Sequence, residues 1–177
     1  MKVNVPSSMH ALARFIVDVP DFPQPGILFR DITPLLHSHF QETVTALDAL
    51  WSDLEWSEAE AVAGIESRGF ILAAALAEKR GKGFVPVRKK GKLPPPIVDR
   101  EYDLEYGSGV LEMQRGVGRL ILVDDVLATG GTLGASAMLA TDAGFCVLHA
   151  GVLIDLGITK DFRCLGKAPR AVIRYGD

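Results

Sequence analysis

Two adjacent carboxylates and a glycine-containing turn follow an apolar run, Leu120 to Val123, in the second half of the chain. The carboxylates are Asp124 and Asp125, and the turn is Ala128-Thr129-Gly130-Gly131-Thr132. Backbone N–H groups at a helix start hold a phosphate without a lysine, and glycines let the main chain approach the anion. Ionised carboxylates only accept hydrogen bonds, so this pair suits sugar hydroxyls or a cationic sugar. The stretch therefore predicts a site for ribose 5-phosphate.

The competing interpretation is that the carboxylates end a strand edge and the glycines form an ordinary helix start. A bare Gly-Gly turn would favour that interpretation, whereas two carboxylates directly after an apolar strand favour the site. No Lys-Ser or Lys-Thr pair follows the glycines, which excludes a Walker P-loop, and the dinucleotide-binding fingerprint is absent.

The acid pair belongs to the second of two strand–turn–helix–strand units. The first unit is predicted as a strand at residues 61–65, a turn at 66–69, a helix at 70–79 and a strand at 84–87. The second is predicted as a strand at 120–123, a turn at 128–131, a helix at 132–143 and a strand at 146–154. This alternation predicts an α/β fold with a mainly parallel sheet flanked by helices on both faces. Such sheets bind ligands at the carboxyl ends of their strands.

The first fifty residues are predicted to contain two helices separated by a stiff loop. A short helix is expected from His10 to Val19, closed by Pro20, and a proline-rich loop from Asp21 to Gly26. A short apolar segment, residues 27–32, follows the loop. Phe40, Val44, Leu47 and Trp51 then share one helical face, which predicts a second helix.

An insertion, residues 89–118, separates the two units and suits neither a core strand nor a core helix. Alternation on either side of Gly107 and Gly109 indicates a solvent-exposed hairpin. Long excursions in compact domains are usually functional, so the insertion is a candidate lid.

Composition narrows the class of protein. The chain has 177 residues, 48% of them hydrophobic, which suits one domain with its own core. The net charge of −3 argues against a nucleic-acid partner. The two cysteines indicate neither a disulfide framework nor a zinc site. No signal peptide or membrane-spanning run is expected, so the cytoplasm is the predicted compartment and no membrane partner is expected.

Five motifs, in order, resemble those of the type I phosphoribosyltransferases, and their adenine branch in particular. They are Phe22 to Ile32, Gly64 to Phe70, Arg88 to Pro94, Leu104 to Gly107 and Leu120 to Thr132. Together they cover most of residues 20–145. One small departure is Pro95, where the family often has glycine. The resemblance implies a single domain, residues 1–177, with an N-terminal hood at about 1–35 and a flexible flap at about 89–118.

The resemblance implies transfer of a 5-phosphoribosyl group from 5-phosphoribosyl 1-diphosphate to adenine, which gives AMP and pyrophosphate in purine salvage. It implies that Glu105 closes over the base as a catalytic carboxyl and that Tyr106 shields the reacting centre. Arg68 is the second implied catalytic residue. The implied base-binding residues are Leu28, Phe29 and Arg30, and the implied diphosphate-binding residues are Glu66, Ser67, Arg68, Arg88, Lys89 and Lys92.

The same resemblance implies three further properties. Mg²⁺ is expected to arrive bound to the diphosphate, so no set of protein metal ligands is required. A non-proline cis peptide is expected near Glu66-Ser67. A homodimer is expected, with Arg88 near its interface.

Two alternative functions remain open at this point. One is a phosphoribosyltransferase that acts on another purine base. The other is a non-catalytic regulator that binds phosphoribosyl diphosphate. A regulator of transcription needs a DNA-reading element, yet only about twenty residues precede the predicted base segment and the net charge is negative.

Overall fold

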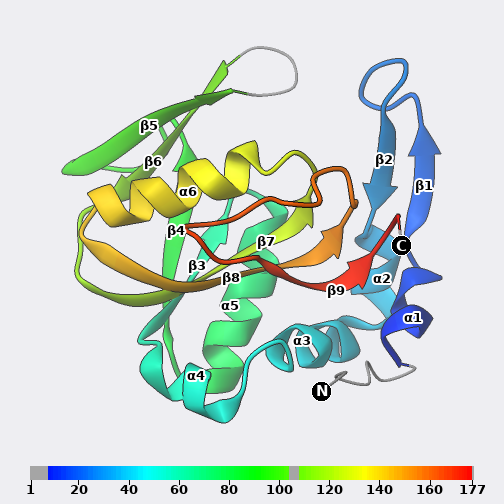
Figure 1. Cartoon of the computed structure of the whole chain (residues 1–177), viewed down its shortest axis with the longest axis horizontal. Coiled ribbons are helices and arrows are strands. Elements are labelled where there is room, and N and C mark those ends of the chain that lie inside the picture. The colour runs from blue at the N-terminus through cyan, green and yellow to red at the C-terminus, as the bar shows by residue number, and fades with distance from the viewer. Residues whose placement is uncertain (1–7, 104–107, 177) are drawn as a thin grey trace. The chain divides into compact units, whose positions relative to one another are not determined.

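The computed structural model describes residues 8–103 and 108–176. The chain forms two compact units, residues 1–46 and 47–177, and the division falls inside α3 (Phe40–Asp48). The predicted hood of about residues 1–35 lies within the first unit. Figure 1 shows the elements of both units.

The first unit contains α1 (Ser8–Ala13), β1 (Val17–Pro20), β2 (Leu28–Asp31) and α2 (Thr33–Ser38). The prediction of a helix from His10 to Val19 was wrong beyond Ala13. Val17 to Pro20 instead pair with β2 in antiparallel register. β-branched Val17 and Val19 alternate with Asp18, a period that suits a strand, and Pro20 stands at the strand end, where a missing N–H is tolerated.

The second unit is built on a seven-stranded sheet with the order β5-β6-β4-β3-β7-β8-β9. Its strands are β3 (Ala61–Ile65), β4 (Gly83–Lys89), β5 (Ile97–Asp103), β6 (Ser108–Gln114), β7 (Gly118–Leu127), β8 (Phe145–Asp155) and β9 (Arg170–Arg174). In this order, the five neighbouring strands from β4 to β9 run parallel, and β5 and β6 pair in antiparallel register. The predicted α/β fold with a mainly parallel sheet is confirmed.

Two helices connect the parallel strands in opposite directions along the sheet. α5 (Arg68–Arg80) leads from β3 to β4, and α6 (Gly131–Asp142) leads from β7 to β8. Because such crossovers are right-handed, the two helices cover opposite faces of the sheet. Figure 1 shows α6 lying across the near face. The strand order therefore reverses between β3 and β7, which is where open α/β sheets bind ligands.

The core of the second unit lies between the sheet and these helices. β7 is the most buried strand, since every residue from Leu120 to Asp125 is buried. Small residues on α5 and α6, Ala73, Ala77, Ala137 and Ala140 among them, let the helices pack close to the strands. β7 is therefore a rigid support for whatever its carboxyl end carries.

Two predicted element boundaries were wrong, and one exposure prediction held only in part. β7 continues to Leu127, so Asp124 and Asp125 lie within the strand and not after it. Trp51 is buried but lies beyond the end of α3, because a further helix, α4 (Asp53–Glu58), begins at the Ser52 cap. The hairpin of the insertion is confirmed as β5 and β6, yet β6 pairs with β4 and buries Leu111 to Met113, so it is not solvent-exposed throughout.

None of the helices in the described ranges has the length and apolarity that a membrane crossing requires.

Glu55 ties α4 to the far edge of the sheet and should make stability depend on pH. Its carboxylate completes a capping box with Ser52 and pairs with Arg170 at 2.5 Å. The hydrogen bond from Arg170 lowers the pKa of Glu55 to about 2, although burial opposes this. A lowered folded-state pKa stabilises the fold above the ordinary value of 4.5, and this stability is lost as pH falls towards 2.

We expect Glu55→Gln to lower the free energy of unfolding at neutral pH by no more than about 2–3 kcal/mol, because Arg170 is partly exposed and the pair is screened. Glutamine preserves the capping box, so the difference from wild type should vanish between pH 4.5 and 2. Urea unfolding at several pH values measures it, with the exposed Glu58→Gln as control. A difference that stays constant with pH would contradict the assignment.

Candidate active site

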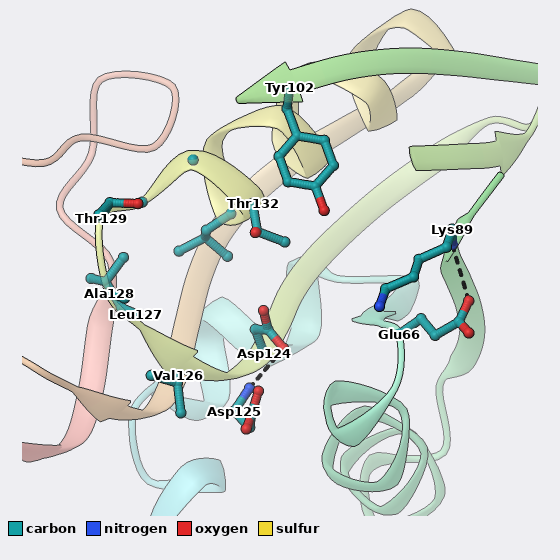
Figure 2. A pocket seen from close by; sticks show the side chains of 13 residues that line it. Glu66, Lys89, Tyr102, Asp124, Asp125, Val126, Leu127, Ala128, Thr129 and Thr132 are labelled. Atoms are coloured by element: carbon teal, nitrogen blue, oxygen red, sulfur yellow. Dashed lines mark hydrogen bonds between the residues drawn. The ribbon is translucent and has the colours of Figure 1, made fainter. Parts of the chain in front are cut away.

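A cavity of about 330 Å³ lies at the carboxyl ends of the central strands. One unbroken run, Asp124 to Leu133, supplies most of its lining, and Glu66, Lys89 and Tyr102 complete it. Figure 2 shows the side chains of these residues. β3 and β7 are the neighbours between which the strand order reverses, so the cavity lies where the topology predicts a ligand site.

The acid pair forms the floor of this cavity. Asp124 and Asp125 are each only 8% exposed, and the backbone N–H of Asp125 donates to Oδ1 of Asp124 at 2.9 Å. Burial raises the pKa of Asp124 well above its ordinary value, and the negative charge of Asp125 raises it further. Two acids held this close in a buried position favour ligands that bring hydroxyl groups or positive charge.

Arg68 at the start of α5 is paired with the acids. Its Nη2 lies 2.6 Å from Oδ2 of Asp125, an ion pair without the alignment of a hydrogen bond. Next to it, Gly69 is a close-approach position, since a Cβ there would meet Oδ1 of Asp124 at 2.9 Å. The helix start therefore packs directly on the acid pair, which places a guanidinium beside the cavity.

The turn after β7 presents a helix start to the cavity. Gly130 is the N-cap of α6 and has a φ of +89°, which other residues rarely adopt. Helix geometry leaves the N–H groups of Gly131, Thr132 and Leu133 without partners inside the helix. These donors, at the positive end of a twelve-residue helix, line the cavity and suit an anion.

A segment that sequence reasoning missed, Thr159 to Phe162, packs against this turn from outside the cavity. The ring of Phe162 packs on Gly130, where a Cβ would come within 2.4 Å of it. Oγ1 of Thr159 donates to the carbonyls of Ala128 and Thr129 at 3.3 and 3.4 Å. With those carbonyls held by Thr159, the turn is fixed in the orientation that its donors require. The segment lies in a loop of mixed polarity, and no local pattern marks it.

Glu66 connects the first strand–turn–helix unit to the cation-bearing end of β4. The carboxylate accepts from the backbone N–H of Lys89 at 3.0 Å and from Nε of Arg88 at 3.3 Å. Burial alone would raise the pKa of Glu66, but the Lys89 amide and the Arg88 guanidinium hold it below its ordinary value. The cis peptide implied by the resemblance is present between Glu66 and Ser67. Ser67 itself is exposed and makes no side-chain cap.

Tyr102, which falls within the insertion predicted as a hairpin, is a further lining residue. Its ring packs over Gly109, where a Cβ would lie 2.8 Å from it. Figure 2 shows its hydroxyl directed towards the cavity from the side opposite the acid pair. Gly109 is the cross-strand partner of Tyr102, and its lack of a side chain leaves room for the ring.

The other predicted site residues do not line this cavity. Leu28, Phe29 and Arg30 form β2 of the first unit, where Arg30 pairs with Asp18 and Phe29 packs edge-on against Phe22. Arg88 and Lys92 are not lining residues either, although Arg88 contacts Glu66, which is one. Glu105 and Tyr106 lie outside the described residues.

Comparisons with known proteins show which proteins this chain resembles in sequence and fold. A family model described as the phosphoribosyl transferase domain matches residues 44–163. Adenine phosphoribosyltransferase of Hydrogenovibrio crunogenus is 48% identical over 169 residues, covering 95% of this chain and 98% of that protein. The crystal structure of adenine phosphoribosyltransferase from Rhodothermus marinus has a TM-score of 0.82 at 40% identity, covering 94% of this chain and 98% of that one. That of the Giardia lamblia enzyme, complexed with 9-deazaadenine, has a TM-score of 0.85 at 33% identity, covering 96% and 98%.

Proposed function

The chain belongs to the phosphoribosyltransferase family, in its adenine branch, and we propose that it transfers the 5-phosphoribosyl group of 5-phosphoribosyl 1-diphosphate to adenine, giving AMP and pyrophosphate in purine salvage. One observation carries this proposal. A helix start whose first N–H groups have no partner inside the helix and a buried acid pair line the same cavity, so a phosphate and a sugar diol find matching partners a few residues apart.

Different residues of the cavity are proposed to bind different parts of the substrate. The N–H groups of Gly131 to Leu133 and the hydroxyls of Thr129 and Thr132 hold the 5-phosphate. Asp124 and Asp125 hold the ribose hydroxyls and stabilise positive charge that develops on the ring as the anomeric bond loosens. The reaction needs no covalent protein intermediate, because positioning and charge stabilisation lower the barrier.

The leaving diphosphate requires cations and amides on the opposite side of the ribose. Arg68 supplies a forked guanidinium from the start of α5. Arg88, Lys89 and Lys92 supply positive charge from the end of β4 and the loop after it. The half-buried Glu66 accepts from the backbone N–H of Lys89, and the side chains of Lys89 and Lys92 are exposed.

Mg²⁺ is proposed to enter as a complex with the diphosphate substrate. Within the described residues, no group of three or more His, Cys, Asp and Glu side chains is arranged to hold a metal ion. The acid pair fits a substrate-borne ion, since a buried Asp124 of raised pKa gains from a neighbouring cation. Bound there, the ion would neutralise charge on the diphosphate and orient it. Chelation of Mg²⁺ should abolish AMP formation.

Adenine recognition is proposed to run through the backbone of Leu28 and Arg30, with Phe29 packing on the base. The Arg30 guanidinium is engaged by Asp18, which supports a backbone role for this residue. A backbone that matches the amine and ring nitrogen of adenine would reject oxo-purines, because a mismatched buried donor goes unpaired. Glu105 is proposed to assist the proton at the imidazole ring of the base, and Tyr106 to shield the reacting centre.

Two properties of the working enzyme complete the proposal. We expect a homodimer, with Arg88 near its interface, and size-exclusion chromatography with light scattering should give twice the mass of one chain. A monomer at assay concentration would contradict this. We also expect the protein to work in the cytoplasm, which fractionation of cells would test.

Incubation of the protein with adenine, 5-phosphoribosyl 1-diphosphate and Mg²⁺ should yield AMP and pyrophosphate in equal amounts. In competition, hypoxanthine, guanine and xanthine should be used at least about a hundredfold less well, because each leaves polar groups of the base site unpaired. Chromatography of the nucleotide products measures both. Preferred use of another base would show that this base, and not adenine, is the substrate. Binding of phosphoribosyl diphosphate without turnover would indicate a regulator.

A further inference from the structure

A buried carboxylate outside the cavity holds the loop that carries the diphosphate-binding cations. Glu112 lies on β6 and is only 1% exposed, although it stands in the middle of the predicted flap. A buried charge is costly unless it is well paired. The mechanism proposed above gives it no role, so its retention in the interior calls for a physical explanation.

Three consecutive backbone N–H groups converge on this carboxylate. Gly91 donates to Oε2 at 2.9 Å, and Lys92 and Leu93 both donate to Oε1 at 2.5 Å. Burial alone would raise the pKa of Glu112, but these three amides and the nearby Arg88 charge lower it overall. Glu112 is thus an ionised anchor that fixes the loop from Gly91 to Leu93.

The anchored loop determines the positions of two residues that are proposed to bind the diphosphate, Arg88 and Lys92. Arg88 is the cross-strand partner of Glu112, and its Nη1 donates to the carbonyl of Lys92 at 3.2 Å. Nε of the same Arg88 contacts Glu66 in the cavity wall. A chain of contacts therefore runs from Glu112 through Lys92 and Arg88 to Glu66.

We propose that Glu112 is a positioning residue that presents Arg88 and Lys92 to the diphosphate, acting through the backbone of residues 91–93. This proposal rests on the proposed function, because it assigns those cations to the diphosphate. Glu112 is not among the residues that line the cavity. Its contribution is that the amides of the loop are already satisfied, so the cations are oriented before the substrate arrives.

Two substitutions of Glu112 distinguish a role through correctly placed hydrogen bonds from a role through negative charge alone. Glu112→Gln has the same shape but replaces one acceptor oxygen with an NH₂ group that opposes the loop amides. Glu112→Asp keeps the charge but withdraws the carboxylate by one methylene. If position matters, both variants should weaken binding, whereas a purely electrostatic role would leave Glu112→Asp close to wild type.

The expected result is selective for one substrate. Both variants should raise the KM for phosphoribosyl diphosphate and the Kd for Mg²⁺-pyrophosphate by about tenfold or more, with the KM for adenine within about twofold of wild type. Amide hydrogen exchange at residues 91–93 should become faster in the same variants. Glu58→Gln, the same chemical change at an exposed position on α4, should alter none of these values.

The Glu112 variants change a buried residue and could misfold, so a second variant is needed that disturbs the loop from its exposed side. Gly91 is exposed and has a φ of +81°, and a Cβ added there would meet open space, so Gly91→Ala disturbs the turn without touching the core. It should also raise the KM for phosphoribosyl diphosphate and leave that for adenine unchanged. Faster exchange at residues 91–93 without any loss of pyrophosphate affinity would overturn the proposal, as would equal effects on both substrates. Failure of wild type to make AMP would refute the proposed function, and the exchange and pyrophosphate measurements would still decide the role of Glu112.

Discussion

Arg68→Ala should lower kcat/KM for phosphoribosyl diphosphate by about 10²- to 10³-fold, the usual effect of removing a charge-stabilising donor from an active site. The guanidinium is the cation nearest to the acid pair among those described, at 2.6 Å from Asp125. Its loss removes a partner of the leaving diphosphate and also leaves a buried carboxylate without its counter-ion.

The two consequences of this change can be separated by experiment. Arg68→Lys retains the charge but not the fork, so it should recover stability more fully than activity. Thermal unfolding and initial rates measure the two effects. Arg119→Ala is a matched control, since Arg119 is exposed and pairs with Glu60, which is exposed as well. An Arg68→Ala enzyme with full activity would remove Arg68 from the site.

Gly130→Ala should abolish productive binding of the 5-phosphate, with a loss in kcat/KM of about 10²-fold or more. The new Cβ would stand 2.4 Å from the Phe162 ring, and the φ of +89° would strain any residue with a side chain. Either relief, moving Phe162 or turning the backbone, displaces the N–H groups that face the cavity.

Gly134→Ala provides the matched comparison in the same helix. Its Cβ would meet the same Phe162 ring at 3.6 Å, which is an ordinary contact. Alanine is also more favourable than glycine in a helix interior. Activity should stay within about twofold of wild type, with stability equal or higher. Calorimetric binding of ribose 5-phosphate measures both variants. Equal affinity of the two variants for ribose 5-phosphate would show that the turn at Gly130 does not determine phosphate binding.

Much of the second unit can be predicted from local patterns because its elements are local. The strand at 61–65 has its predicted bounds, and the two helices begin within two residues of their predicted starts. Apolar runs followed by glycine turns identify such units, and the acid pair and the helix start lie close together along the chain. Local residue patterns therefore locate the run that lines the cavity.

The missed features depend on partners far away in the chain. Glu112 resembles a hairpin surface residue, yet its neighbours Leu111 and Met113 are both buried, and the apolar run around it is the available signal of a buried charge. Thr159 and Phe162 act on a turn thirty residues earlier. The helix predicted through Val19 fails for a similar reason, since pairing with β2 overrides local preference.

The unbroken run from Asp124 to Leu133 also has an evolutionary consequence. Its internal spacing is set by adjacent peptide bonds, whereas the residues proposed to select the base occupy a different compact unit. If the proposed roles are right, ribose-phosphate binding and nucleobase choice are encoded in separate parts of the chain. Under that proposal, changes that reshape the backbone from Leu28 to Arg30 would alter purine preference in a descendant of this chain and leave its sugar-phosphate site intact.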